Sequence, residues 1–335
     1  MPADPKKIKK TAEIGRRDIA LSMAYVPMSE RVLFGSSDFK LYEVDFAVEK
    51  PEPTAFEGHT SYITGVAPAG KYVVTGSYDR RLIWWDAESL EKIRETENAH
   101  ARWMRGVEAS PDGKTIASVA DDMVCRLWDA ESGKPLHELR GHEEQTPNHY
   151  PSMLYACAFS PSGEQIAPVD RVGKIVVWDV ASGKQLATME APENYTWDPR
   201  QRRHSIGGLR SVAFRPDGKL LAVGGMGQVG NIDHLGGKAR VEIFDWQKQE
   251  RTHEYGDGEF KGLVETLVWH PKGEWLAAAG GDNSGWLMFF DLADEKGAAK
   301  NEKAPMHVHE MALSEDADQI WAVGHGKMVS WEISG

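Results

Sequence analysis

The sequence predicts an all-β fold assembled from repeated antiparallel units, and three features support this prediction. An apolar run that ends in a large residue and an acid recurs seven times, at Val44-Asp45, Trp85-Asp86, Trp128-Asp129, Trp178-Asp179, Phe244-Asp245, Phe290-Asp291 and Trp331-Glu332. The intervals between the first members are 41 (85−44), 43 (128−85), 50 (178−128), 66 (244−178), 46 (290−244) and 41 (331−290) residues. A period near forty residues indicates stacked repeats. The 33 glycines and 12 tryptophans suit many short strands, because glycine supplies turns and tryptophan fills the space between units.

Each unit reads as a meander of four strands. From Gly58 to Asp86 the apolar runs are Tyr62 to Pro68, Tyr72 to Val74 and Leu82 to Trp85, with turns at Ala69-Gly70 and Tyr78-Asp79. Such short, β-rich runs between turn residues predict antiparallel strands. The first turn recurs as Pro111-Asp112-Gly113, Pro161-Ser162-Gly163, Pro216-Asp217-Gly218 and Pro271-Lys272-Gly273, in which glycine is expected to take the positive φ. A polar turn after the closing acid leads to a fourth, outer strand.

The spaced features of these units resemble the WD-repeat β-propeller family. They are Gly58-His59, the Pro-Asp-Gly turn, Asp79 in the next turn and the closing Trp85-Asp86, and the resemblance covers essentially the whole chain. It implies a seven-bladed β-propeller of four-stranded antiparallel blades around a central channel. We therefore expect residues 1–335 to form a single domain, with blades that end near residues 45, 86, 129, 179, 245, 291 and 332.

The resemblance also implies a hydrogen-bonded set of four side chains in each regular blade. One set is His59, Thr75, Asp79 and Trp85, and the next is His100, Ser118, Asp122 and Trp128. A histidine beside an acid and a hydroxyl imitates a hydrolase triad, but recurrence in tight turns favours a structural role. In the third Trp-Asp unit, Pro168 and Val172 occupy the hydroxyl and acid positions, so His142 is expected to lack both partners.

The last unit stops after Trp331-Glu332, without room for an outer strand. Lys7 to Thr11 aligns with the outer strand Lys92 to Thr96, so we expect Ile8 to Ala12 to pair with the last blade and close the ring. The nearby cluster Lys6, Lys7, Lys9 and Lys10 is expected to protect this edge strand. A targeting signal or a patch for an acidic partner is the alternative.

Charge and cysteine content limit the classes of partner. The formal net charge of −12 opposes attraction to phosphate backbones, which argues against nucleic acid. Cys125 and Cys157 lie in apolar predicted strands and are expected to be buried thiols. Residues 1–10 hold no apolar segment of signal-peptide length, and no apolar run approaches the roughly 18 residues of a membrane span. We therefore expect a cytoplasmic protein without nucleic-acid or membrane partners.

Three long insertions fall on connections that share one edge of the ring, here called the top rim. They are 143–152, 191–205 and 226–238, and long ordered loops on a rigid scaffold often carry binding residues. Exposed Tyr, Trp and Arg dominate interface hot spots, and clustered arginines suit an acidic peptide, a carboxylate or a phosphate. The alternative is that these side chains only pack the insertions onto the rim. The candidate partner-binding residues are His149, Tyr150, Tyr195, Trp197, Arg200, Arg203, His204, Asp233 and His234.

The sequence thus predicts a noncatalytic protein-protein interaction scaffold that binds partner proteins at the top rim of blades four to six. The alternative is a propeller hydrolase or lactonase that uses a metal in the central channel. Separately, His149, His204, Asp233 and His234 could converge at the rim to hold zinc or iron, and His307-Val308-His309 on the same rim is a less favourable set. The hydrolase or lactonase class needs inward-facing acids or histidines, whereas the inner strands read Val212-Ala213-Phe214 and Ala156-Cys157-Ala158. We therefore expect no catalytic residue, metal or cofactor.

Overall fold

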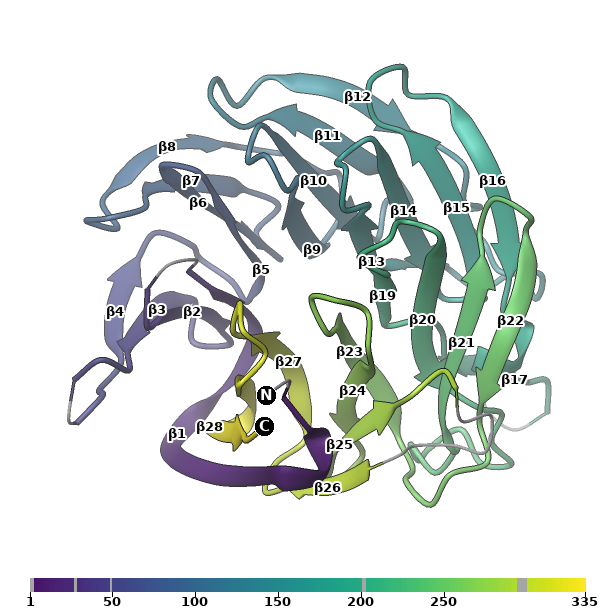
Figure 1. Ribbon diagram of the computed structural model, residues 1–335. Coiled ribbons are helices and arrows are strands. Elements are labelled where there is room, and N and C mark those ends of the chain that lie inside the picture. The colour runs from purple at the N-terminus through teal and green to yellow at the C-terminus, as the bar shows by residue number, and fades with distance from the viewer. Residues whose placement is uncertain (1–2, 27–28, 49, 201–202, 294–299) are drawn as a thin grey trace.

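The computed structural model describes residues 3–26, 29–48, 50–200, 203–293 and 300–335. Figure 1 shows its strands arranged as sheets around a central opening, with one strand of each sheet at the opening and others toward the periphery. Within the described residues there are five four-stranded sheets, one six-stranded sheet and a separate two-stranded hairpin. The structure thus confirms an all-β propeller of four-stranded antiparallel blades.

The four-stranded sheets each use consecutive strands in chain order. Their strands are β5 (Ile63–Ala69), β6 (Tyr72–Ser77), β7 (Leu82–Asp86) and β8 (Lys92–Thr96); β9 (Met104–Ala109), β10 (Thr115–Ala120), β11 (Cys125–Asp129) and β12 (Pro135–Leu139); β13 (Leu154–Phe159), β14 (Gln165–Asp170), β15 (Lys174–Asp179) and β16 (Gln185–Glu190); β19 (Ser211–Phe214), β20 (Leu220–Met226), β21 (Ala239–Asp245) and β22 (Glu250–Tyr255); and β23 (Leu263–Trp269), β24 (Leu276–Gly281), β25 (Gly285–Phe290) and β26 (Lys300–Ala304).

The six-stranded sheet contains both ends of the described chain. Its order is β27 (Val308–Leu313), β28 (Gln319–Ile333), β1 (Ile8–Tyr25), β2 (Arg31–Ser36), β3 (Lys40–Asp45) and β4 (Thr54–Glu57). The prediction of seven blades is wrong in number, since the described residues form six sheets around the ring. The cause is β1, which pairs with β28 from Ile8 to Ile19 and then with β2 from Ala20 to Tyr25. One continuous strand therefore joins the first and last expected units.

The segment expected to pair with the last unit lies against β28. Ile8 stands opposite Ile333 and Ala12 opposite Ser330. Just before it, the short 3-10 helix η1 (Pro5–Lys7) follows Asp4, whose backbone N–H donates to the carbonyl of Ser334 at 3.1 Å. The two ends of the described chain consequently lie side by side in Figure 1.

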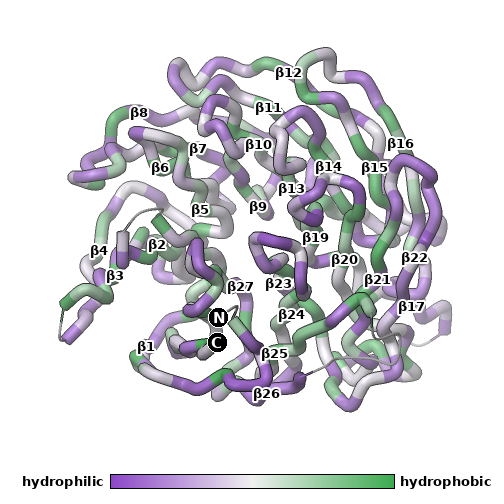
Figure 2. Tube along the Cα trace, in the orientation of Figure 1, coloured by the Kyte–Doolittle hydropathy of each residue, from purple (hydrophilic) through white to green (hydrophobic). Residues whose placement is uncertain are grey.

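Apolar side chains fill the spaces between neighbouring sheets. Trp84 of β7 is fully buried, packs with Met104 and Ile116 of the next sheet, and donates its indole N–H to the Ala130 carbonyl at 3.0 Å. Figure 2 shows hydrophobic residues along strands such as β15 and β24 and hydrophilic residues in many connecting loops. The Pro-x-Gly turns form as expected, with φ of 68° at Gly113 and 75° at Gly163.

The insertion 191–205 is more regular than the loop expected from the sequence. It contains the 3-10 helix η2 (Pro192–Asn194), followed by β17 (Tyr195–Asp198), which pairs with β18 (His204–Gly207) as an antiparallel hairpin. Residues 201–202 within it lie outside the described residues. Both cysteines are buried and free, as expected. No helix in the described ranges is long and apolar enough to cross a membrane.

Candidate functional site

The two expected hydrogen-bonded sets lie inside their sheets. Trp85 Nε1 donates to Thr75 Oγ1 at 2.9 Å, Thr75 Oγ1 lies 2.8 Å from His59 Nε2, and His59 Nδ1 donates to Asp79 Oδ2 at 3.0 Å. Burial opposes ionisation of Asp79, but the hydrogen bond and charge of His59 hold the pKa of its carboxyl well below the usual range. Both His59 and Thr75 are buried, so this arrangement connects strands of one sheet and presents no nucleophile to a ligand.

The second set repeats this geometry. Trp128 Nε1 donates to Ser118 Oγ at 2.8 Å, Ser118 Oγ lies 2.8 Å from His100 Nε2, and His100 Nδ1 donates to Asp122 Oδ1 at 3.0 Å. Burial lowers the pKa of His100 despite the neighbouring carboxylate, which favours the neutral imidazole. A neutral ring that donates from Nδ1 accepts the serine hydroxyl at Nε2, so each donor in the set has an acceptor.

The third Trp-Asp unit differs from its expectation in one respect. The prediction that His142 lacks an acid is wrong, because Asp170, the last residue of β14, takes that role. His142 Nδ1 donates to Asp170 Oδ2 at 2.8 Å. The hydroxyl is missing, since Pro168 stands at that position. As a result, His142 Nε2 and Trp178 Nε1 are buried without a hydrogen-bond partner among the described residues.

At the top rim, two of the insertions pack against each other through aromatic rings. The ring centroid of Tyr150 lies 6.0 Å from that of Trp197 and 4.8 Å from that of His204. The guanidinium of Arg171 lies 4.9 Å from the Tyr150 centroid, and Tyr195 donates its hydroxyl to Asn148 Oδ1 at 3.0 Å. The structure thus places the aromatic candidates in one cluster, with Tyr150, Tyr195 and Trp197 half-buried.

Most of the other candidates are exposed residues of the same three insertions. The third insertion contacts the hairpin through the Val229 N–H, which donates to Thr196 Oγ1 at 3.1 Å. Burial and the charge of Arg171 lower the pKa of His204. The exposed candidates are His149, Arg200, Arg203, His204, Asp233 and His234.

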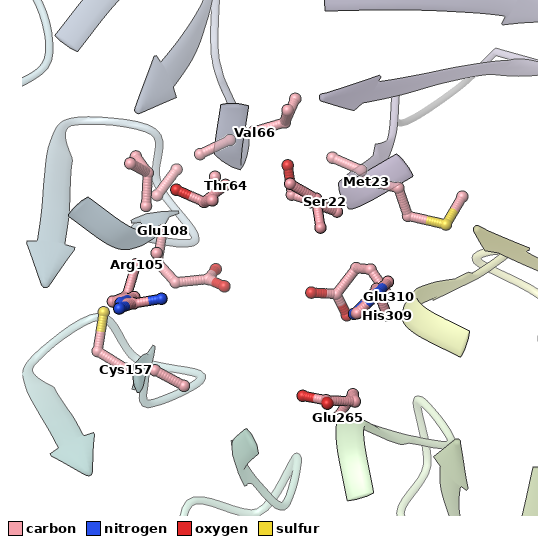
Figure 3. Close-up of a pocket in the computed structure, with 18 of the residues that line it drawn as sticks. Ser22, Met23, Thr64, Val66, Arg105, Glu108, Cys157, Glu265, His309 and Glu310 are labelled. Carbon is pink, nitrogen blue, oxygen red and sulfur yellow. The ribbon is translucent and has the colours of Figure 1, made fainter. Parts of the chain in front are cut away.

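The central channel holds charged groups that sequence reasoning missed. Its cavity volume is about 630 Å³, and it is lined in part by Arg105, Glu108, Arg210, Glu265, His309 and Glu310. Figure 3 shows the carboxylates of Glu108, Glu265 and Glu310 directed into the opening. The expectation of apolar inner strands is correct for β13 and β19. It is wrong for β9, β23 and β27, which carry Glu108, Glu265 and Glu310.

The channel environment shifts the pKa values of these acids in different directions. Enclosure by protein, with the added charge of Glu310, raises the pKa of Glu108 to about 8, although its side chain retains access to solvent in the channel. Burial likewise raises the pKa of Glu310 to about 7, although Thr266 donates a hydrogen bond to it. Burial opposes ionisation of Glu265 too, but His307 and the charge of Arg210 lower its pKa to about 2. Glu265 is thus the anionic member of the three.

A repeat position could have revealed part of this lining. Arg105, Tyr155, Arg210 and Glu265 each stand six residues before the proline of the following turn (111−105, 161−155, 216−210 and 271−265). His309 has the same place before Glu315 in the last unit, whose turn hydrogen bonds match those of the preceding sheet. All of these residues line the channel. Arg210 lies 3.7 Å from the Tyr155 ring centroid, so neighbouring members of this position are in contact.

One group in the described residues brings three possible metal ligands together. The ligand atoms of Glu265, His307 and His309 lie within 4.8 Å of one another. His149, His204, Asp233 and His234, which the sequence offered as possible ligands, form no such group in the same described ranges.

A row of aromatic side chains near the channel was also missed. Ring centroids are 5.9 Å apart for Phe39 and Tyr62, 5.6 Å for Tyr62 and Tyr78, and 4.9 Å for Tyr78 and Trp103. Trp103 is 55% exposed, the highest value among the large exposed hydrophobic residues described. Each lies on a connection into an inner strand or between second and third strands, so the row belongs to the same face as the insertions.

Comparison with known families agrees with this architecture. The model described as WD domain, G-beta repeat matches residues 50–86 and 91–129, the two units that contain complete hydrogen-bonded sets. The chain thus contains two WD repeats. The third Trp-Asp unit keeps the four-strand pattern outside the matched residues, but its side-chain set is incomplete.

Several curated proteins resemble parts of this chain. Nuclear distribution protein PAC1 of Arthroderma otae is 36% identical over 72 residues, which cover 22% of this chain and 15% of the relative. Small ribosomal subunit protein RACK1y of Oryza sativa subsp. japonica is 35% identical over 89 residues, covering 25% and 26%. Nuclear distribution protein nudF of Emericella nidulans is 30% identical over 139 residues, covering 39% and 30%. The chain therefore matches less than a third of the length of each relative.

Proposed function

We propose that this chain is a noncatalytic scaffold that binds partner protein at the top rim of the sheets β13–β16, β19–β22 and β23–β26. The observation that supports this most directly is the cluster of Tyr150, Trp197 and His204, built from two insertions and linked to the third. Half-buried aromatic rings lose little conformational entropy on binding and offer large apolar contact areas, which suits them to interface anchors.

The charge of the rim indicates the kind of surface that fits it. Arg200 and Arg203 are exposed beside the aromatic cluster on a chain whose formal net charge is −12. A local positive patch on an acidic protein favours a partner segment that carries carboxylates or phosphate, since arginine binds both with paired hydrogen bonds. We propose an acidic protein segment as the ligand, in the cytoplasm and without nucleic acid or membrane.

The names of the relatives are compatible with this proposal. RACK1y is named as a protein of the small ribosomal subunit, and PAC1 and nudF as nuclear distribution proteins, and none of these names refers to a catalysed reaction. The proposal includes a single domain over residues 1–335, closed into a ring by the pairing of β1 with β28.

Affinity capture from the native cell tests the rim. The full chain is compared with a variant in which Trp197, Arg200, Arg203 and His234 are replaced by alanine, and we expect the variant to lose the partners that the full chain retains. A matched control replaces Ile93, Leu136 and Leu186, exposed residues of the outer strands β8, β12 and β16, and should retain them. Circular dichroism and thermal melting establish that each variant is folded.

A third variant separates the rim from the aromatic row. Trp103→Ala removes the most exposed member of that row without touching the insertions. Loss of partners in Trp103→Ala with full retention in the rim variant would place binding near the row and refute the proposal. Retention in every variant would also refute it.

A further inference from the structure

We propose that Glu265, His307 and His309 form a binding site for a divalent transition-metal ion, of which Zn²⁺ is the representative, at the top mouth of the central channel. Two imidazole nitrogens and one carboxylate oxygen form a ligand set typical of zinc and iron. Calcium and magnesium prefer oxygen ligands and fit this set poorly.

The distances come close to those of a tetrahedral ion. With bonds of about 2.0 to 2.2 Å, neighbouring ligand atoms of Zn²⁺ lie about 3.4 Å apart. Glu265 Oε1 and His307 Nε2 are already 3.4 Å apart, and the full set lies within 4.8 Å. Closing the widest separation requires a movement of roughly 1.4 Å. His309 can supply it because its ring is half-buried and borders the channel, as Figure 3 shows for His309 and Glu265.

The two histidine nitrogens that would bind the ion make no well-formed hydrogen bond within the described residues, and Glu265 is the acid next to them, 3.4 Å from His307 Nε2. His307 Nε2 and His309 Nε2 are both buried and lack a hydrogen-bond partner, and His307 is only 5% exposed. Buried polar atoms without partners are rare because each costs free energy. A cation at this point would satisfy both nitrogens at once, which gives the pair a reason to be present.

A second contact orients His307 for this role. Its Nδ1 donates to the backbone carbonyl of Asp282 at 2.8 Å, so Nε2 is the nitrogen that faces Glu265. Metal-bound histidines typically use their other nitrogen in this way, which fixes the tautomer and the ring orientation. His325 lies next to the pair, with ring centroids 5.1 Å from His307 and 4.9 Å from His309.

The backbone that carries His307 is held by close packing. A Cβ at Gly324 would lie 1.8 Å from the His307 carbonyl oxygen, and one at Gly285 would lie 1.7 Å from the Met306 carbonyl oxygen. The His325 N–H also donates to the His307 carbonyl at 3.1 Å. Glycine at these positions lets the neighbouring strands approach, so His307, the residue just before β27, is held in a fixed position.

Charges in the channel act in both directions on a cation. Glu108 and Glu310 face the same opening and attract it only in their ionised forms, which their raised pKa values disfavour, whereas Arg210 contributes a positive charge near Glu265 and His309. Arg105 is largely neutralised, because its guanidinium donates two bonds of 2.7 Å to Asp121. The carboxylate of Glu265 is therefore the group on which binding depends most.

Calorimetric titration of the untagged full chain with ZnCl₂, after removal of metal with a chelator, tests the proposal. We expect one ion per chain, and a characteristic visible absorption when Co²⁺ replaces Zn²⁺. Glu265→Gln and His309→Gln should each weaken binding at least tenfold, since even loss of an outer contact to a metal ligand costs about 10- to 100-fold. Zn²⁺ should also raise the melting temperature of the full chain and fail to raise that of Glu265→Gln.

Histidines of the rim provide the matched controls. His149→Ala and His234→Ala remove exposed imidazoles outside the channel and should leave Zn²⁺ affinity within about twofold, because neither residue contacts the channel group. Absence of binding by the full chain would overturn the proposal. So would equal affinity in folded Glu265→Gln and His309→Gln, or loss of binding in the rim variants instead.

Discussion

At the scale of single residues, Pro168 explains why the third Trp-Asp unit has two unsatisfied buried atoms. Thr75 and Ser118 stand ten positions before Trp85 and Trp128 (85−75 and 128−118), and Pro168 has the same place before Trp178 (178−168). A hydroxyl at this position receives the indole N–H and donates to the imidazole. Proline offers neither group.

Pro168→Ser is therefore expected to stabilise the protein. The new hydroxyl would satisfy Trp178 Nε1 and His142 Nε2, a gain of about 1 to 2 kcal/mol. Loss of proline increases the freedom of the unfolded chain, which costs about 0.4 to 1 kcal/mol. Urea unfolding followed by tryptophan fluorescence measures the net change. Pro168→Ala is the control with the same loss of proline, and equal stability of the serine and alanine variants would contradict the explanation.

The residues that were predicted and those that were missed differ in what surrounds them. The sets of His59 and His100 follow from the family resemblance, because their members lie within one repeat, on two adjacent strands and the connections beside them. Glu108 and Glu265 each follow a buried valine on an inner strand, and in a lone sheet the face that carries them would meet bulk water. Closure of the sheets around a channel turns that face inward, and only comparison of the same position across the repeats, six residues before each turn, indicates it for Glu265.

At the scale of elements, β1 is the strand whose extent the sequence did not indicate. The pairing of Ile8 to Ala12 with β28 is present, but the strand continues to Tyr25 and crosses to β2. The crossing contains Gly15-Arg16-Arg17-Asp18, a polar run that is typical of a loop. In the structure, these residues belong to β1. The guanidinium carbon of Arg16 lies 4.0 Å from the ring centroid of Tyr42 and 4.7 Å from that of Phe34, so its side chain packs on the neighbouring strands.

Asp18 is expected to stabilise this crossing. Its Oδ2 accepts bonds from Arg16 Nη2 at 2.7 Å and from the Ser36 hydroxyl. Burial opposes ionisation, yet these contacts lower the pKa of Asp18 below its ordinary value. Asp18→Asn should cost about 1.5 to 3 kcal/mol at pH 7, the range for hydrogen bonds to a charged group. Urea unfolding measures this cost, and Asp38→Asn, at an exposed carboxylate of the β2–β3 turn, should cost less than about 1 kcal/mol.

The same carboxyl predicts how this cost varies with pH. A carboxyl whose folded pKa is depressed contributes stability above its unfolded pKa, about 3.9, and loses it as pH falls through the lower folded pKa. The difference between the natural chain and Asp18→Asn should thus be constant from about pH 5 to 8 and narrow below about pH 4. A difference that narrows near neutral pH would indicate a different titrating group.

At the scale of the whole molecule, the repeat predicted the ring but not the number of sheets. Of the seven recurring pairs of a large residue and an acid, two, Val44-Asp45 and Trp331-Glu332, lie in the one six-stranded sheet. A period in sequence counts units, whereas hydrogen bonding decides which units share a sheet. Because β1 lies between β28 and β2, the first and last units share one sheet, and the ring has six sheets where the repeat predicts seven.

Removal of residues 1–15 tests whether that pairing closes the ring. It would leave one edge of β28 without its hydrogen-bonded partner and expose part of the buried side chains of Met328, Trp331 and Ile333. Several kcal/mol of apolar burial would be lost, so the melting temperature should fall by roughly 10 °C or more. A peptide of residues 4–16 added in excess should restore part of the loss by binding the free edge.

Alanine at Lys6, Lys7, Lys9 and Lys10 keeps the strand and removes its charge, and should change the melting temperature by only a few degrees. An unchanged melting temperature in the truncated chain would show that the ring is held together without β1. A large loss in the alanine variant would instead assign the stabilisation to the charges.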